Sequence, residues 1–221
     1  MFIGHYGVSL VAAARPRAPG LGTLFVAAQL IDIAFFSFLL IGIEHMRLVP
    51  GATASNAMDL YDLPYTHSLI GTLVWAAGFA LLLRLAGLRW PAALIGAAVV
   101  ISHWLLDLLV HRPDLTIAGG PPRLGLGLWN MPLIEHAIEL AFAYGAMLVF
   151  ARATRGPQAP LLILAVLMAA LQAVNWTTPQ PPAIVDPVPA SVPLLGLFAY
   201  GLLAAAAWWV SWTRQLRDTV A

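Results

Sequence analysis

The sequence predicts an all-α, polytopic integral membrane protein with about six transmembrane helices and a short re-entrant helix at its N-terminus. Of its 221 residues, 61% are hydrophobic and 10% are charged, whereas soluble domains carry about 25% charged residues. Long apolar stretches alternate with short loops that contain proline, glycine and arginine. The net charge of +1 argues against a nucleic-acid partner, and the absence of cysteine excludes disulfides and thiolate ligands.

The first segment, residues 1–14, is apolar and carries His5. As a helix it would be about 21 Å long, which is too short to cross a bilayer, so we expect it to be re-entrant. Its basic residues follow its apolar part, the opposite of the order in a cleavable signal peptide. The first full span is expected at about residues 22–43, with Asp32 near its middle, and a polar loop at 46–65 follows it.

The remaining apolar stretches predict five further spans. Thr66 is a suitable N-cap for the first of these. Residues 1–152 then form the core that carries the polar residues, and residues 153–221 add two helices of the same domain without obvious chemistry. The five spans are expected at about residues 66–83, 90–110, 128–150, 161–174 and 192–212.

The arginines are unevenly divided between the two sides that this topology defines. One side receives eight arginines and the other receives three. Because positive residues concentrate in cytoplasmic loops, we expect the first side, with both termini, to be cytoplasmic. The larger set is Arg15, Arg17, Arg84, Arg89, Arg152, Arg155, Arg214 and Arg217, and the smaller is Arg47, Arg112 and Arg123.

The most informative stretch is residues 101–111, which places His103, Asp107 and His111 at four-residue spacing in an apolar helix. Each four-residue step drifts only about 40° around the helix axis, so the three side chains share one face. Ionisable groups in hydrocarbon cost a few kcal/mol each and need a common reason to be there. His-x-x-x-Asp offers one nitrogen and one carboxylate to a metal ion; an imidazole satisfied by a carboxylate without metal is the alternative.

Helical rise places further polar residues at similar depths. We expect them to share the outer half of the membrane around a cavity open to the extracytoplasmic side, with His111 at the outer interface. Measured from the cytoplasmic ends, the depths are about 15 Å for His5 and Asp32, about 20 Å for His103 and Glu139, and about 25 Å for Asp107 and His67.

Each of these residues also has a simpler interpretation. Asp32 could be a hydrogen-bonded core carboxyl, His67 an interfacial residue and His5 a structural histidine. His45, Glu44 and His111 lie at span ends, as interfacial residues or as partners of metal ligands. Asp62 is an ordinary turn residue in solvent, but over a metal it could act as a base or orient a histidine ligand.

Taken together, the motifs resemble those of the bacterial inner-membrane metal-dependent hydrolases, the family that includes a LexA-regulated member. The resemblance covers residues 1–150 and rests on Gly-His, an aspartate in the first span, Pro-Tyr-Thr-His-Ser-Leu, Ser-His-Trp-Leu-Leu-Asp, His-Arg-Pro-Asp and Gly-Leu-Trp-Asn. That family is distantly similar to zinc-dependent phospholipase C. By the order of ligands in that enzyme, the resemblance implies His5, Asp32, His67, His103 with Asp107, and Glu139 with His136. The spacing departs at the last pair, which is His136-x-x-Glu139 here and His-x-x-x-Glu in the enzyme.

These observations predict a membrane-embedded metal-dependent hydrolase whose metal ligands are His5, Asp32, His67, His103 and Asp107. We expect one or two divalent ions, zinc before iron or manganese, with Asp62 or Glu139 as the base. The bilayer location suggests a lipid or lipid-linked phosphoester, reached from the extracytoplasmic side of a bacterial inner membrane. The alternatives are a non-enzymatic transporter or proton relay that uses the same groups, and a structural subunit with a stabilising metal.

Overall fold

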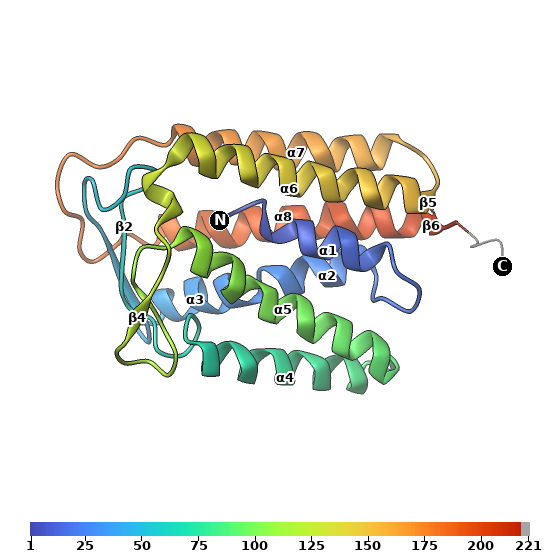
Figure 1. Cartoon of the computed structure of the whole chain (residues 1–221), viewed down its shortest axis with the longest axis horizontal. Helices are drawn as coiled ribbons and strands as arrows, with labels where there is room; N and C mark the ends of the chain where they lie inside the picture. Colours follow the sequence, from blue (N-terminus) through green and yellow to red (C-terminus); the bar gives the residue numbers. More distant parts are fainter. Residues whose placement is uncertain (218–221) are drawn as a thin grey trace.

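The computed structural model describes residues 1–217 and is mostly helical, with its longer helices running along one long axis (Figure 1). This agrees with the predicted all-α class. The helices of this part of the chain are α1 (His5–Ala13), α2 (Leu21–Ala28), α3 (Leu30–Leu40), α4 (Leu69–Leu85), α5 (Trp90–Val110), α6 (Pro132–Ala153), α7 (Ala159–Thr177) and α8 (Ser191–Thr213).

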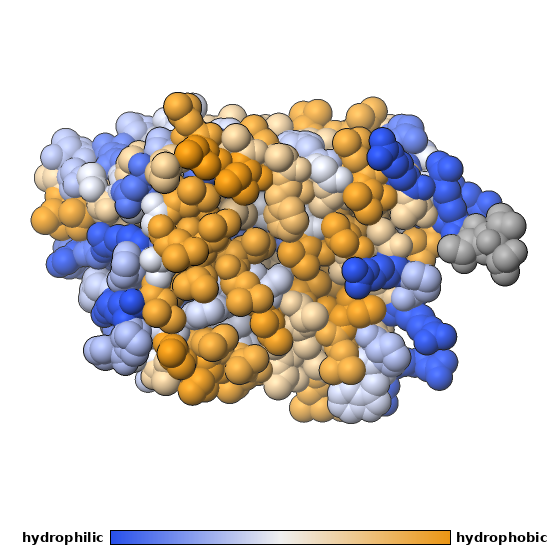
Figure 2. Space-filling model, viewed as in Figure 1, coloured by the Kyte–Doolittle hydropathy of each residue, from blue (hydrophilic) through white to orange (hydrophobic). Residues whose placement is uncertain are grey.

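Four helices, α5 to α8, are long and apolar enough to cross a membrane, and a fifth span results if α2 and α3 are counted together. Six spans were expected, and α4 accounts for the difference. Its 17 residues extend only about 25 Å, which is short for a membrane span. A band of hydrophobic side chains covers the middle of the molecule, and hydrophilic side chains gather at both ends (Figure 2). This distribution is that of a protein surrounded by lipid at its waist.

The span expected at residues 22–43 is broken at Gln29, where α2 and α3 meet at a bend of 54°. The carbonyl of Ala28 accepts a hydrogen bond from His103 Nδ1, at 2.7 Å, and the Gln29 side chain donates to the carbonyl of Phe2, at 3.1 Å. The break therefore places Asp32 in the first turn of a new helix. An apolar pattern alone does not reveal this break, because its cause lies in other segments.

Short antiparallel strand pairs close both ends of the bundle (Figure 1). One end carries β1 (His45–Leu48) with β2 (Met58–Asp62), and β3 (Leu115–Thr116) with β4 (Arg123–Leu124). The opposite end carries β5 (Thr154–Arg155) with β6 (Gln215–Leu216). The expected loop at 46–65 is thus a β-hairpin, which we call the outer hairpin.

Two apolar clusters fill the interior. The larger occupies the halves of the helices toward β5 and β6, and its fully buried side chains include Leu10, Leu24 and Leu203. The smaller lies under the outer hairpin and includes Phe35, Leu60 and Trp129. The polar residues singled out by the sequence lie between the two clusters.

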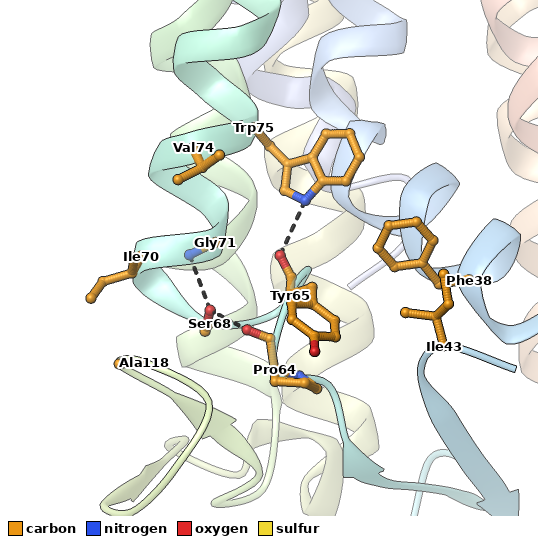
Figure 3. A pocket seen from close by; sticks show the side chains of 10 residues that line it. All are labelled: Phe38, Ile43, Pro64, Tyr65, Ser68, Ile70, Gly71, Val74, Trp75 and Ala118. Carbon is orange, nitrogen blue, oxygen red and sulfur yellow. Dashed lines mark hydrogen bonds between the residues drawn. The ribbon is translucent and has the colours of Figure 1, made fainter.

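The start of α4 differs from the prediction, because Ser68 and not Thr66 is its N-cap. Ser68 Oγ accepts from Gly71 N, at 3.0 Å, and donates to the carbonyl of Pro64, while Trp75 Nε1 donates to the carbonyl of Tyr65 (Figure 3). A Cβ on Gly71 would overlap the Tyr65 carbonyl oxygen. Glycine is therefore required for the segment at residues 64–68 to lie this close to α4, beside the surface groove drawn in Figure 3.

We expect Gly71→Ala to destabilise the protein by about 1–3 kcal/mol, because the added methyl overpacks this contact. Gly78→Ala is the matched control, since Gly78 lies in the same helix with nothing within 4 Å of its Cβ position, and it should be neutral or stabilising by up to about 1 kcal/mol. Thermal unfolding in detergent micelles measures both. Equal effects of the two substitutions would contradict the close contact.

Candidate metal centre

The structure brings the five predicted metal ligands together from separate elements. His5 lies in α1, Asp32 in α3, His67 directly before α4, and His103 and Asp107 in α5. The three histidines and Asp107 are almost completely buried. Two overlapping groups, His5–His103–Asp107 and Asp32–His67–His103, have ligand atoms within 4.8 Å of one another.

In four of these residues, each imidazole Nε2 lies 3.0–3.7 Å from an oxygen of both carboxylates, and we call Asp32, His67, His103 and Asp107 the four-ligand set. His103 Nε2 lies 3.0 Å from Asp107 Oδ2 and 3.6 Å from Asp32 Oδ1. His67 Nε2 lies 3.4 Å from Asp32 Oδ1 and 3.7 Å from Asp107 Oδ2. Two imidazole nitrogens and two carboxylate oxygens therefore converge in the interior.

Hydrogen bonds on the far side of each ring decide which nitrogen carries the proton. His103 Nδ1 must donate, because its partner is the carbonyl of Ala28. The single hydroxyl proton of Thr66 goes to Glu44 Oε2, at 2.6 Å, so Thr66 Oγ1 accepts from His67 Nδ1, at 2.9 Å. In both neutral rings Nε2 then has a lone pair that faces the carboxylates.

Lone pairs and carboxylate oxygens repel one another unless a metal ion lies between them or the imidazole carries a second proton. Tyr200 donates to Asp32 Oδ2, at 2.9 Å, which leaves Oδ1 to face the two imidazoles. His103 Nε2 is buried and, among the described residues, finds no hydrogen-bond partner of acceptable geometry. An orphaned buried nitrogen facing two carboxylates is the arrangement expected of metal ligands.

Four of the six distances within the four-ligand set are close to those around a small divalent ion. Tetrahedral coordination with ligand bonds of about 2.0–2.1 Å separates the ligand atoms by about 3.3 Å. The four distances between imidazole nitrogens and carboxylate oxygens are 3.0–3.7 Å. Two carboxylates and two neutral imidazoles would also balance the charge of one divalent ion, which matters in a buried site. These four residues therefore fit the divalent metal ion that the sequence predicted.

The other carboxylate oxygen of Asp107, Oδ1, lies close to two further histidines. Asp107 Oδ1 lies 3.1 Å from His5 Nε2 and 3.5 Å from His111 Nε2, and the His5 ring stacks on that of His103 with centroids 3.9 Å apart. His111 was expected at the outer interface, but it is buried and its Nδ1 lies 2.8 Å from Asp114 Oδ1. Burial alone would lower the pKa of His111, yet the carboxylates of Asp107 and Asp114 raise it. The cluster therefore attracts positive charge.

Glu139 lines the cavity but is committed to three hydrogen bonds. Its Oε1 accepts from the backbone N–H groups of Phe2, at 2.5 Å, and Gly4, at 3.0 Å, and its Oε2 accepts from Gln172 Nε2, at 3.0 Å. These bonds hold the segment that carries His5. The carboxylate of Glu135, one turn earlier on α6, is also buried and lines the same cavity.

Two other candidates lie outside the cluster. Asp62 pairs with His45 on the outer hairpin at 2.9 Å, where both side chains are 47% exposed. Asp62 does not belong to the described residues that line the cavity. The ring of His136 stacks on Trp176 with centroids 3.9 Å apart. The structure thus gathers the predicted metal ligands and leaves Asp62 at the surface.

A cavity of about 380 Å³ leads to the cluster. Asp32, His67, Asp107 and His111 lie in its wall, together with apolar side chains of α3, α7, α8 and the outer hairpin. The ligands are therefore accessible to a small or elongated molecule without being exposed on the outer surface.

We found no match to this chain among protein-family models, curated proteins or solved structures. The resemblance to bacterial inner-membrane hydrolases stays a prediction, and the argument about this site rests on its geometry.

Three residues near the site have roles that the sequence did not predict. Glu44 is fully buried and accepts three hydrogen bonds, from Tyr65 N, Thr66 N and the Thr66 hydroxyl. His111 has a signal in the sequence, since it is four residues after Asp107 and three before Asp114. Tyr200 lies in a helix expected to carry no chemistry, and nothing in its local sequence indicates that it reaches Asp32.

We expect Thr66→Val to weaken zinc binding by about 10- to 100-fold, because it removes the acceptor that orients His67. Thr66→Ser keeps the hydroxyl and should bind zinc like the wild type. Competition with a chromophoric chelator measures both affinities in detergent. If Thr66→Val bound zinc as tightly as Thr66→Ser, the proposed orientation of His67 would be incorrect.

Proposed function

We propose that this protein is a membrane-embedded, metal-dependent hydrolase that acts on a lipid or lipid-linked phosphoester. The observation that carries the proposal is that the imidazoles of His67 and His103 face the carboxylates of Asp32 and Asp107 at 3.0–3.7 Å, beside a largely apolar cavity lined by His67 and both carboxylates. Such a site combines a place for a Lewis acid with room for an apolar substrate.

The first ion in this proposal is zinc, held by Asp32, His67, His103 and Asp107. A set of two nitrogen and two oxygen ligands suits zinc, with iron or manganese as the next choices. Asp107 Oδ1 with His5 and His111 forms a second, weaker set for another ion. His5 is thus a ligand of the second ion and, through Asp107, positions a ligand of the first.

A divalent ion in this place would supply Lewis acidity, lowering the pKa of a water molecule and polarising the phosphoryl or acyl group. The protein supplies the surroundings. Glu135 and Glu139 are carboxylates in the cavity wall that could accept a proton from the substrate or from water. Glu139 already accepts three hydrogen bonds, so Glu135 is the more available base of the two. The apolar walls hold the substrate and limit the entry of water.

The proposed topology has six spans, counting α4 and the bent α2–α3 pair, with α1 as a re-entrant helix. α1 packs against α2, α5 and α6, which suits a segment surrounded by protein at membrane depth. The arginine-rich end with β5 and β6 then faces the cytoplasm, and the outer hairpin faces the extracytoplasmic side of a bacterial inner membrane.

A proton relay or transporter would need polar residues to continue to the cytoplasmic end. The halves of the helices below the four-ligand set are instead packed with apolar side chains, among them Phe25, Val100 and Met168. This packing favours a site that works from one side of the membrane.

Metal analysis provides the first test. Protein purified without added metal should contain zinc, with a second equivalent bound at saturating zinc, and His5→Ala should lose only the second equivalent. Anomalous diffraction should place an ion beside His103. A map without an ion there would end the proposal, and a wild-type maximum of one equivalent would remove the second site.

Activity provides the second test. The protein should release phosphate or a phosphorylated headgroup from a phospholipid in reconstituted vesicles, and Asp107→Asn should reduce the rate to that of protein-free vesicles. Asp62→Asn is the control for a surface carboxylate and should keep its zinc and at least half of the rate. If zinc-loaded wild type hydrolysed none of a panel of phospholipids and lipid-linked phosphates, while its fold and metal were intact, a structural metal would be the better explanation.

A further inference from the structure

We propose that the cavity takes the apolar chain of a bilayer lipid, which enters sideways from the membrane between α7 and α8. The side chains of Val174 and Leu195 would form this entrance, which we call the lateral portal. The inference rests on the proposed function and deepens it, because it identifies the lipid chain as the part of the substrate that the two C-terminal helices recognise.

Hydrogen bonds tie the α7–α8 loop to the outer hairpin at the outer end of the cavity. Leu48 in the outer hairpin exchanges two hydrogen bonds with Val185 in the α7–α8 loop, at 3.1 and 2.9 Å. Gln180 accepts from Gly51 N, at 2.7 Å, and donates to the carbonyl of Thr53, at 3.3 Å. Loop and hairpin thus form one cover, and both contribute residues to the cavity wall. Entry from the aqueous side would require this cover to open.

The sides of the cavity reach the lipid-facing surface. Val174 and Leu195 line the cavity and are 54% and 61% exposed, whereas Ala199 and Leu60 in the same wall are 8% and 3% exposed. The cavity wall therefore contains exposed side chains at the lipid-facing surface and buried side chains that bulk lipid cannot reach. α7 and α8 pack against each other as consecutive antiparallel helices, which brings these two exposed residues to a similar depth.

Each of the two helices presents one continuous stripe to the cavity. On α8 the lining residues recur every three to four positions, which is the spacing of a single helix face. This stripe is apolar for about 12 Å and ends at Tyr200, whose hydroxyl binds Asp32. The stripe consists of Val192, Leu195, Gly196, Ala199 and Tyr200. The stripe therefore connects the covered end of the cavity with the metal ligands.

Polar groups lie at the covered end of the same cavity. Asn175 and Thr178 extend the stripe of α7, and Ser55, Asn56 and Gln180 come from the cover. An amphiphile can place its headgroup among these groups and its chain against α8. A water-soluble ester would leave the apolar stripe without a partner, so the observations favour a lipid as occupant.

Photolabelling tests the lateral portal directly. Protein in phosphatidylethanolamine and phosphatidylglycerol vesicles is irradiated with a phospholipid that carries a diazirine in its acyl chain, and the labelled residues are identified by mass spectrometry. We expect labels on Leu60 and Ala199, which bulk lipid cannot reach. Leu195→Trp should reduce these labels at least fivefold by filling the portal. Leu82, 64% exposed on α4, serves as the internal standard for labelling by bulk lipid.

Leu194→Trp is the matched control, because Leu194 is 54% exposed next to Leu195 but is not a lining residue. It should leave the cavity labels unchanged, and both variants should keep their zinc. Absence of label on Leu60 and Ala199 in the wild type, or equal labelling in the two variants, would overturn the portal. Labelling requires neither metal nor turnover, so a labelled cavity in a protein without zinc or activity would overturn the proposed function and leave the portal intact.

Discussion

The structure depends on the interactions that stabilise the carboxylates of Asp32 and Asp107 in the interior of the helical bundle. Each carboxylate faces the Nε2 atoms of His67 and His103, whose protons are held on the opposite side of the ring. Without a metal ion or a further proton on the imidazoles, this arrangement would place electron-rich atoms against one another in a low dielectric, which is strongly unfavourable. A divalent ion would turn the same contacts into ligand bonds. The break of the first span, the close approach at Gly71 and the hydrogen bonds of Glu44 all serve this geometry.

Several irregular features therefore have one explanation. The α2–α3 break frees the Ala28 carbonyl for His103, and the cap at Ser68 begins α4 one residue after His67. A regular helix through either place would point these groups elsewhere. The cost of interrupting helices at membrane depth is offset where freed backbone groups find protein partners, as the Ala28 carbonyl does with His103 and the N–H groups of Tyr65 and Thr66 do with Glu44. The broken helices thus position the backbone groups that make the polar contacts of the site.

The sequence predicted the helical class with apolar, membrane-compatible helices, and it singled out five polar residues that the structure brings together, because both depend on local signals. An ionisable residue in an apolar stretch is conspicuous, and helical rise places it at a depth. The roles of Glu44 and Tyr200 could not be predicted in this way, since each depends on which distant segment lies opposite. The break at Gln29 and the outer hairpin were missed for the same reason, because tertiary contacts override the local pattern.

The two C-terminal helices show how such tertiary context assigns a role. Their sequence carries no cluster of ionisable residues, and by composition alone they are ordinary membrane spans. In the structure their apolar stripes form a wall that begins at the lipid-facing surface and ends where Tyr200 binds Asp32. If the substrate is a lipid, as proposed, these apolar residues would contact it directly, because it would arrive from the same medium that the helices contact. A site that draws its substrate from the bilayer needs its polar chemistry covered on the aqueous side and open on the side of lipid. The contacts between the α7–α8 loop and the outer hairpin correspond to the first condition, and the exposed lining residues Val174 and Leu195 correspond to the second.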